Sequence, residues 1–150
     1  MQRIRVQHEP FDIAAEQAGL SQGRPQVGAI VTFVGLTRDS NEDAAIRSLT
    51  LEHYPGMTEK ALAAVADEAS ERWGLDAITI IHRVGMLTPP DPIVFVGVAS
   101  RHRGEAFLAC EFLIDALKTR APFWKKESCP EGDRWVDARA SDAAAAQRWG

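Results

Sequence analysis

Lys118 and Lys125 are the residues whose type and spacing are best suited to chemistry in this chain. Lys118 falls in the last turn of an expected helix, and Lys125 follows Pro122 on an expected strand. If both side chains enter one cleft, the two ammonium groups repel each other and each lowers the pKa of the other. A lysine tuned in this way can act as a nucleophile or as a general acid or base near neutral pH. The alternative for Lys118 is a structural role, as a cation at a helix C-terminus near Asp115.

A second cationic group, Arg101, His102 and Arg103, lies between an apolar strand-like run and the start of the next expected helix. Free backbone N–H groups and the positive end of the helix dipole gather at such a junction, which favours binding of a phosphate or a carboxylate. The two guanidinium groups add paired donors of their own. We therefore predict an anion site here, with exposed turn charges as the simpler alternative.

Short apolar segments separated by turn residues define the elements that must position these side chains. Apolar runs, alternating or continuous, predict strands at residues 3–7, 27–34, 46–52, 77–82, 93–99, 123–128 and 134–137. Helical spacing and end signals predict helices at residues 12–20, 58–73, 105–119 and 142–148. Polar residues 35–44 predict a loop, and TPPDP at 88–92 predicts a rigid turn. This mixture predicts one domain, residues 1–150, of the α+β class rather than a doubly wound parallel sheet.

Periodicity assigns faces to the residues around the two lysines. Strand alternation after Pro122 puts Phe123, Lys125 and Glu127 on one face, and Trp124, Lys126 and Ser128 on the other. Helical spacing groups Phe107, Cys110, Ile114 and Leu117 into one apolar stripe. Cys110 is therefore predicted to be a core residue rather than a reactive thiol.

The charge of the chain is unevenly distributed. The 150 residues carry a formal net charge of −4, from 17 Lys and Arg against 21 Asp and Glu. Residues 101–126 hold six Lys and Arg and three acids, so this segment is +3 and the remainder is −7. A local positive patch on an acidic protein indicates a small anionic substrate or an acidic tail of a partner. Duplex nucleic acid normally selects a basic domain, so we do not expect it as a partner.

Composition and cysteine use exclude several protein classes. Apolar residues make up 45% of the chain, and no apolar run approaches the ~20 residues that span a bilayer. The first residues lack the apolar stretch of a signal peptide, so we expect a cytoplasmic protein without a membrane partner. Cys110 and Cys129 fit neither a disulfide framework nor a thiolate zinc site, and the four histidines lack metal-ligand spacing. Glycine-rich phosphate loops and the GxSxG motif are absent as well, which leaves the basic segment as the candidate site.

Several blocks of the sequence resemble one enzyme family. They are LEHYPGMTEKA at 51–61, IHRVG at 81–85, VFVGV at 94–98, LKTRAPFWKKE at 117–127 and EGDRWV at 131–136. The LKTRAPFWK stretch is long and chemically unusual, and the blocks run in order through nearly the whole chain. On these residues the chain is identified as a member of the large, catalytic subunit family of molybdopterin synthase.

The resemblance implies an α/β-hammerhead domain with an added α+β part and a sulfurtransferase activity. Members of the family convert cyclic pyranopterin monophosphate into molybdopterin by inserting two dithiolene sulfurs, with no metal or other cofactor at this step. The sulfur comes from a thiocarboxylate on the C-terminal Gly-Gly of a small ubiquitin-like partner subunit. Two large subunits form a homodimer, and one small subunit at each end completes a heterotetramer.

The resemblance also implies roles for individual residues. Lys118 would lie closest to the carboxyl terminus of the partner and assist sulfur transfer, whereas Lys125 would bind substrate and act as an acid or base. The implied substrate-binding residues are Leu36, Thr37, Arg38, His102, Arg103, Lys126, Glu127 and Arg139. Lys126 stands where many relatives carry arginine, and a lysine keeps the charge but loses the paired donors of a guanidinium.

Three other interpretations remain open at this point. A non-catalytic module could hold a ubiquitin-like tail or a phosphorylated ligand in the same basic cleft. A persulfide relay on Cys129 would lack a neighbouring cysteine to resolve the intermediate. Nucleic-acid binding through Phe123, Trp124 and the lysines would need stacking on these rings and is disfavoured by the acidic balance.

Overall fold

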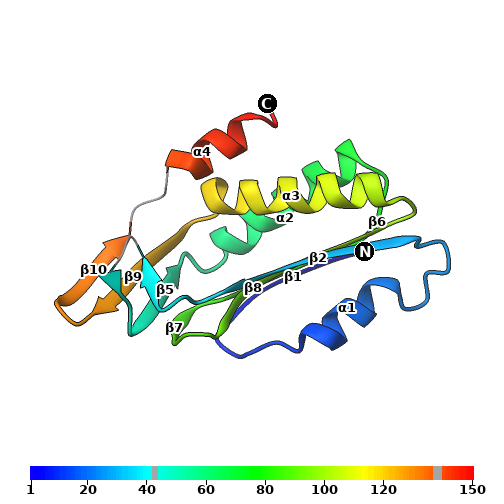
Figure 1. Ribbon diagram of the computed structural model, residues 1–150. Coiled ribbons are helices and arrows are strands. Elements are labelled where there is room, and N and C mark those ends of the chain that lie inside the picture. Colours follow the sequence, from blue (N-terminus) through cyan, green and yellow to red (C-terminus); the bar gives the residue numbers. More distant parts are fainter. Residues whose placement is uncertain (42–43, 137–139) are drawn as a thin grey trace.

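The computed structural model describes residues 1–41, 44–136 and 140–150, which form two four-stranded sheets and a small hairpin with helices packed around them (Figure 1). The helices are α1 (Ile13–Ser21), α2 (Met57–Arg72), α3 (Arg103–Arg120) and α4 (Ala140–Gln147). The strands are β1 (Gln2–Gln7), β2 (Ala29–Leu36), β3 (Ser40–Asn41), β4 (Ala44–Ala45), β5 (Ser48–His53), β6 (Leu75–Arg83), β7 (Gly85–Leu87), β8 (Pro92–Ser100), β9 (Phe123–Cys129) and β10 (Gly132–Val136). The predicted α+β class is confirmed.

The first sheet has the strand order β1-β6-β8-β2. β1 pairs parallel to β6, and the other two pairings are antiparallel. Helices α2 and α3 cover one face of this sheet, and α1 lies against the other face (Figure 1). The central strands β6 and β8 are therefore buried on both faces, which explains why their sequences are almost continuously apolar.

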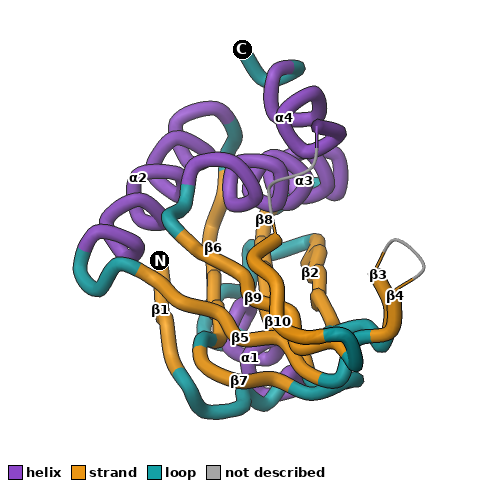
Figure 2. Tube along the Cα trace, turned by 90° about the vertical axis from the view of Figure 1, so that its left-hand side faces the viewer, coloured by secondary structure: helices purple, strands orange, loops and turns teal. Residues whose placement is uncertain are grey.

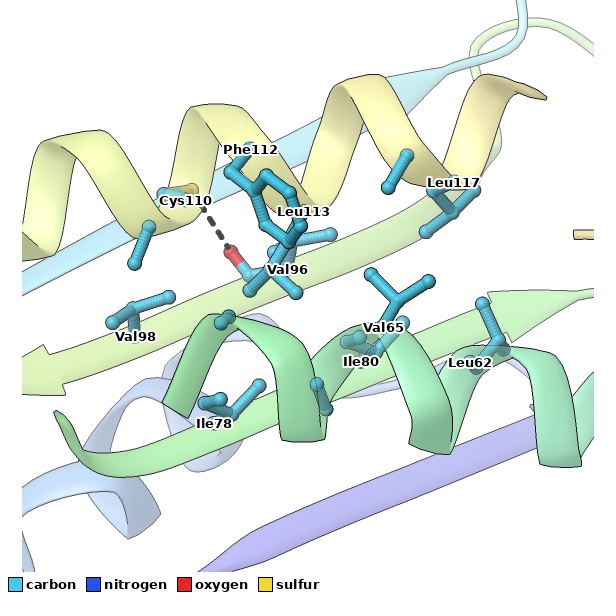
Figure 3. Close-up of a cluster of buried hydrophobic side chains, with 14 of the residues drawn as sticks. Leu62, Val65, Ile78, Ile80, Val96, Val98, Cys110, Phe112, Leu113 and Leu117 are labelled. Atoms are coloured by element: carbon cyan, nitrogen blue, oxygen red, sulfur yellow. Dashed lines mark hydrogen bonds between the residues drawn. The ribbon is translucent and has the colours of Figure 1, made fainter. Parts of the chain in front are cut away.

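The main core lies between the first sheet and helices α2 and α3 (Figure 3). Alternate residues of β8, including Val96 and Val98, point into it, as do Ile78 and Ile80 of β6. The helices contribute chiefly Leu62, Val65, Cys110, Phe112, Leu113 and Leu117. The two-residue period of the strands and the apolar faces of the helices together form this core.

The opposite face of the first sheet is covered by α1. Leu20 has no exposed surface and packs with Ala77, Ile81, Phe95 and Ala99. A Cβ atom at Gly97 would lie 2.6 Å from Cδ1 of Leu20. Glycine at this position is therefore what lets α1 approach β8 so closely.

The second sheet has the order β10-β9-β5-β7 and is antiparallel throughout. It lies at one end of the first sheet, on the left in Figure 1 and towards the viewer in Figure 2. Leu49, Leu51, Val84 and Leu87 form its small buried cluster. The sequence did not predict β7, because a strand of three residues is too short to show alternation.

Two sequence-based assignments were wrong. The loop predicted at residues 35–44 contains the end of β2 and the short β3–β4 hairpin. Phe107, predicted in the apolar stripe of α3, is 62% exposed. The buried face of α3 is built largely from small residues instead: Ala106, Ala109, Cys110, Phe112, Leu113, Ala116 and Leu117. Of the helices in the described ranges, none is long and apolar enough to cross a membrane.

Candidate active site

A pocket of about 540 Å³ opens where the C-terminal end of α3 meets both sheets. Its polar and charged lining comes from the end of β2 and the hairpin, β6, α3, β9 and α4: Thr37, Arg38, Ser40, Asn41, His82, Lys118, Lys125, Glu127 and Asp142. Arg38, Lys118 and Lys125 are cationic. Of the two acids, the Glu127 carboxylate is paired with the guanidinium of Arg134, which leaves Asp142 against three cations. The positive groups therefore dominate, and the pocket suits an anionic ligand.

The two lysines singled out in the sequence line this same pocket. Lys118 lies in the last turn of α3, and Lys125 lies on β9 after a short turn through Pro122. Thr58, fully buried at the start of α2, donates from Oγ1 to the Pro122 carbonyl at 3.0 Å and accepts from the Tyr54 N–H at 3.0 Å. The start of α2 therefore fixes the turn that joins the two lysines.

The predicted alternation along β9 is confirmed. Phe123, Lys125 and Glu127 line the pocket, while Trp124 is 49% exposed. Lys126 lies on the outer face, where its Nζ is 5.7 Å from the centroid of the Trp135 ring. Lys126 is therefore placed outside the pocket of its own chain, and its implied role in substrate binding stays a prediction.

The other wall of the pocket is the segment that follows β2. Leu36 is half-exposed at the strand end, and Thr37 is buried. The Thr37 N–H and Oγ1 both donate to the Asp91 carbonyl, at 2.8 and 3.0 Å. Arg38 is exposed beside this anchored residue and lines the pocket. The structure thus brings Leu36, Thr37 and Arg38 together with the two lysines.

His82 is a pocket residue to which the sequence assigned no role. Its Nδ1 is 2.8 Å from the Arg83 carbonyl, and a carbonyl only accepts, so the proton is assigned to Nδ1 and the lone pair to Nε2. Burial lowers the pKa of His82 to about 4; the hydrogen bond to Arg83 opposes this, and the positive charges of Lys125, Lys118 and His53 add to it. The imidazole is therefore neutral at pH 7. The IHRVG block, which contains this residue, was the signal that could have identified it.

The cationic group at the other end of α3 does not join the pocket within one chain. His102 and Arg103 are exposed where α3 begins, and Lys118 lies 15 residues further on. At ~1.5 Å per residue, this separates Arg103 from Lys118 by roughly 22 Å along the helix axis. The anion site predicted at this junction stays a prediction. Arg139, the remaining residue of the implied substrate-binding set, lies outside the described residues.

Both cysteines are free thiols in buried positions. Cys110 belongs to the main core, as predicted, and its S–H donates to the Val96 carbonyl at 3.9 Å (Figure 3). Burial, with a smaller contribution from Glu111, raises the pKa of this thiol to about 12. Cys129 is 7% exposed and is not among the residues that line the pocket, which disfavours a persulfide relay. Over the described ranges, no three His, Cys, Asp or Glu side chains are grouped closely enough to hold a metal ion.

Comparison with known proteins connects this pocket to one family. The MoaE protein family matches residues 6–120, which is more than half of the chain. The molybdopterin synthase catalytic subunit of Ralstonia nicotianae is 57% identical over 150 residues, covering 100% of this chain and 85% of that protein. The molybdopterin synthase catalytic subunit of Escherichia coli is 56% identical over 147 residues, covering 98% and 97% of the two chains. The solved structure of the molybdopterin biosynthesis MoaE protein from Burkholderia ambifaria is similar with a TM-score of 0.86 at 53% identity, covering 100% of this chain and 99% of that one. On sequence and on fold, the chain belongs to the MoaE family.

Proposed function

We propose that this chain is the catalytic subunit of a molybdopterin synthase that acts in the cytoplasm. In this role it is a sulfurtransferase that converts cyclic pyranopterin monophosphate into molybdopterin. The observation that carries the proposal is the convergence of Lys118, Lys125 and Arg38 on one pocket of about 540 Å³. The names of the two similar proteins, each at more than 55% identity over nearly the whole chain, support the same activity.

The sulfur donor in this proposal is a small ubiquitin-like partner with a C-terminal Gly-Gly thiocarboxylate. The name "catalytic subunit", carried by both similar proteins, itself refers to an enzyme with a further subunit. A thiocarboxylate tail is a narrow anion, so it fits an open pocket lined by cations. Because the partner brings the sulfur, the chain needs no reactive cysteine, in agreement with the buried state of Cys110 and Cys129.

Each cationic residue of the pocket has its own role in the proposed reaction. Lys118, at the exposed end of α3, stabilises the negative charge that develops on the oxygen of the thiocarboxyl group when its carbon is attacked. The sulfur of the partner forms a bond to a substrate carbon as a C–O bond at that carbon breaks. Water then attacks the acyl carbon of the partner and cleaves its bond to sulfur, which restores the carboxylate and leaves the sulfur on the substrate. Lys125, half-buried on β9, binds substrate and exchanges a proton with it. Arg38 binds the phosphate through paired guanidinium donors.

We further propose that two copies form a homodimer and that two small subunits complete a heterotetramer. This assembly offers a place for His102 and Arg103, which lie too far along α3 to reach the pocket of their own chain. In a dimer they can line the pocket of the second copy, so that each substrate site draws residues from both chains.

A single-turnover assay tests the activity. The chain is mixed with its thiocarboxylated partner and cyclic pyranopterin monophosphate, and dithiolene product is followed for wild type, Lys118→Ala and the control Lys60→Ala. Lys60 is exposed on α2 and is the lysine outside the basic segment. We expect wild type and Lys60→Ala to form product equally, and Lys118→Ala to lose about a hundredfold or more in rate.

Two other outcomes would change the conclusion. Equal product from Lys118→Ala and wild type would keep the activity but move the chemistry to Lys125. If wild type binds the partner and forms no product, the chain is a binding module and the catalytic proposal is wrong.

A further inference from the structure

The carboxylate of Glu127 is buried in the pocket wall and is hydrogen-bonded on both oxygens. Only 3% of this residue is exposed. Asn41 donates from Nδ2 to Oε1 and Oε2 at 3.2 and 3.1 Å, and Arg134 donates from Nε to Oε1 at 3.0 Å. A buried carboxylate depends on such partners to offset the loss of hydration. Glu127 is therefore fixed in place by side chains from two other segments.

These contacts connect segments that strand pairing leaves separate. In the described part of the chain, β3 and β4 pair only with each other, whereas β9 and β10 belong to the second sheet. Arg134 also donates from Nη2 to the Asn41 carbonyl at 3.4 Å. We call these three residues, Asn41, Glu127 and Arg134, the Glu127 cluster. The cluster thus connects the β3–β4 hairpin to the second sheet through side-chain hydrogen bonds.

Arg38 lies between the Glu127 cluster and a second anchor. On one side, Thr37 is bonded twice to the Asp91 carbonyl. On the other side, Asn41 is held by Glu127. The Arg38 guanidinium is exposed towards the pocket and makes no hydrogen bond or ion pair with any described residue. The backbone between the two anchors therefore fixes where the Arg38 side chain begins, and this limits the part of the pocket that its guanidinium can reach.

We infer that Asn41 and Arg134 are positioning residues for substrate binding, and that Glu127 acts with them by holding the Arg38 segment. In this inference Glu127 does not touch the substrate, although the family resemblance places it in the substrate-binding set. The inference rests on the proposed function, which gives Arg38 the phosphate of the substrate. A guanidinium binds phosphate through paired, directional hydrogen bonds, so a displacement of about 1 Å weakens the contact strongly.

Steady-state kinetics of Arg134→Met give the first test. We expect the KM for cyclic pyranopterin monophosphate to rise about tenfold, with little change in kcat at saturating substrate. The reason is that the phosphate contact of Arg38 binds the ground state and the transition state equally, so weakening it affects only substrate binding. Arg134→Lys keeps the charge and should recover part of the effect. The matched control is Arg5→Met: the Arg5 side chain is 39% exposed and ion-paired with Glu16, compared with 43% for Arg134, and it lies away from the pocket. A similar rise in KM in Arg5→Met would overturn the inference.

A double-mutant cycle separates positioning from a general loss of stability. If Arg134 acts through Arg38, then Arg134→Met should change KM in the wild-type background and have no further effect in an Arg38→Ala background. If the fold-changes in KM caused by Arg134→Met and Arg38→Ala multiply in the double variant, Arg134 does not act through Arg38. That result would overturn the inference. A fall in kcat without a rise in KM for Glu127→Gln would instead make Glu127 a catalytic group.

Amide hydrogen exchange gives a readout that needs no activity. The Ile46 N–H donates to the Asp39 carbonyl at 2.8 Å and closes the base of the hairpin segment. We expect exchange at Ile46 to quicken about tenfold in Arg134→Met and Asn41→Ala, and to stay unchanged in Arg5→Met. If wild type forms no product but exchange responds in this way, the proposed function fails while the holding role of the cluster stands. Unchanged exchange in both variants overturns the inference.

Discussion

The imidazole of His82 stacks on the ring of Phe123, with ring centroids 3.9 Å apart and ring planes 21° apart. His82 is near the end of β6 and Phe123 begins β9, so this contact joins the first sheet to the second beside the two lysines. A stacked, neutral imidazole can lie next to ammonium groups without adding to their mutual repulsion. Its protonation would place a third positive charge in the same wall.

Lowering the pH should therefore destabilise the protein through His82. The unfolded imidazole takes up a proton near pH 6.5, and the folded one only near pH 4. Between these values the unfolded state binds more protons, so the free energy of unfolding falls as the pH drops through this window. The shift from 6.5 to about 4 corresponds to roughly 3 kcal/mol. Above pH 7 the group is neutral in both states and contributes no pH dependence.

Urea unfolding at several pH values measures this effect in wild type and in His82→Phe. The phenylalanine keeps an aromatic ring against Phe123 but cannot be protonated. Acid should therefore reduce the stability of wild type more than that of the variant, although the variant starts lower because it loses the bond to the Arg83 carbonyl. Equal losses in both chains would assign the acid sensitivity to other groups.

Two phenylalanines on α3 should respond very differently to truncation. Phe112 is 2% exposed and makes edge contacts with Trp73 and Trp149, with centroids 5.5 and 5.6 Å away. Phe112→Ala should reduce the free energy of unfolding by about 3–5 kcal/mol, because it opens a cavity in the core. Phe107→Ala removes a ring that is 62% exposed, so it should change the free energy of unfolding by less than about 0.5 kcal/mol. Chemical denaturation of both variants checks the pair, and comparable losses would contradict the assignment of faces on α3.

Cys110 should be inert towards thiol reagents in the folded protein. At pH 8, a thiol with a pKa of about 12 has roughly a thousandth of the thiolate of a thiol with the ordinary pKa of 9.0, and burial also blocks access to it. Labelling is best followed in a Cys129→Ser chain, where Cys110 is the remaining thiol. We expect the rate to rise steeply on addition of urea. Fast labelling of the folded chain would show that the core near Val96 opens without global unfolding.

Mixing two inactive chains tests whether sites are shared between copies. If Arg103 serves the pocket of the second copy, Lys118→Ala and Arg103→Ala homodimers are both impaired, yet a mixed dimer contains one intact site. After unfolding and refolding together, the mixture should recover about a quarter of the wild-type rate through random pairing. Recovery no greater than the sum of the separate variants would place Arg103 outside the site.

The parts of this structure that the sequence predicted correctly depend on local signals. Pro122 separates α3 from β9, and strict alternation then places Lys125 in the pocket and Trp124 outside it. The hydrogen bonds from Asn41 to Glu127 join residues 86 positions apart, and no spacing rule connects them. His82 looked like one more residue of a buried strand, because its stacking partner belongs to another sheet.

The exposed position of Phe107 shows a different limit of prediction from sequence. A rule based on hydrophobic spacing gives a large aromatic residue more weight than alanine when it assigns the buried face of a helix. Alanine side chains, however, are small and let a helix pack closely on a sheet. The face of α3 that carries Ala106, Ala109 and Ala116 is therefore the buried one. Pattern alone finds the helix, whereas its rotation about its own axis depends on the shape of the surface against which it packs.

The parallel pairing of β1 with β6 sets an order of assembly during synthesis on the ribosome. β1 precedes β6 by about 70 residues in the chain, so the nascent chain carries β1 without its neighbour while those residues are made. The first sheet can close once β8 has emerged, before α3 is complete. Lys118 and Lys125 are made later still, so the anion-binding pocket can form only after all the strands of the first sheet are available.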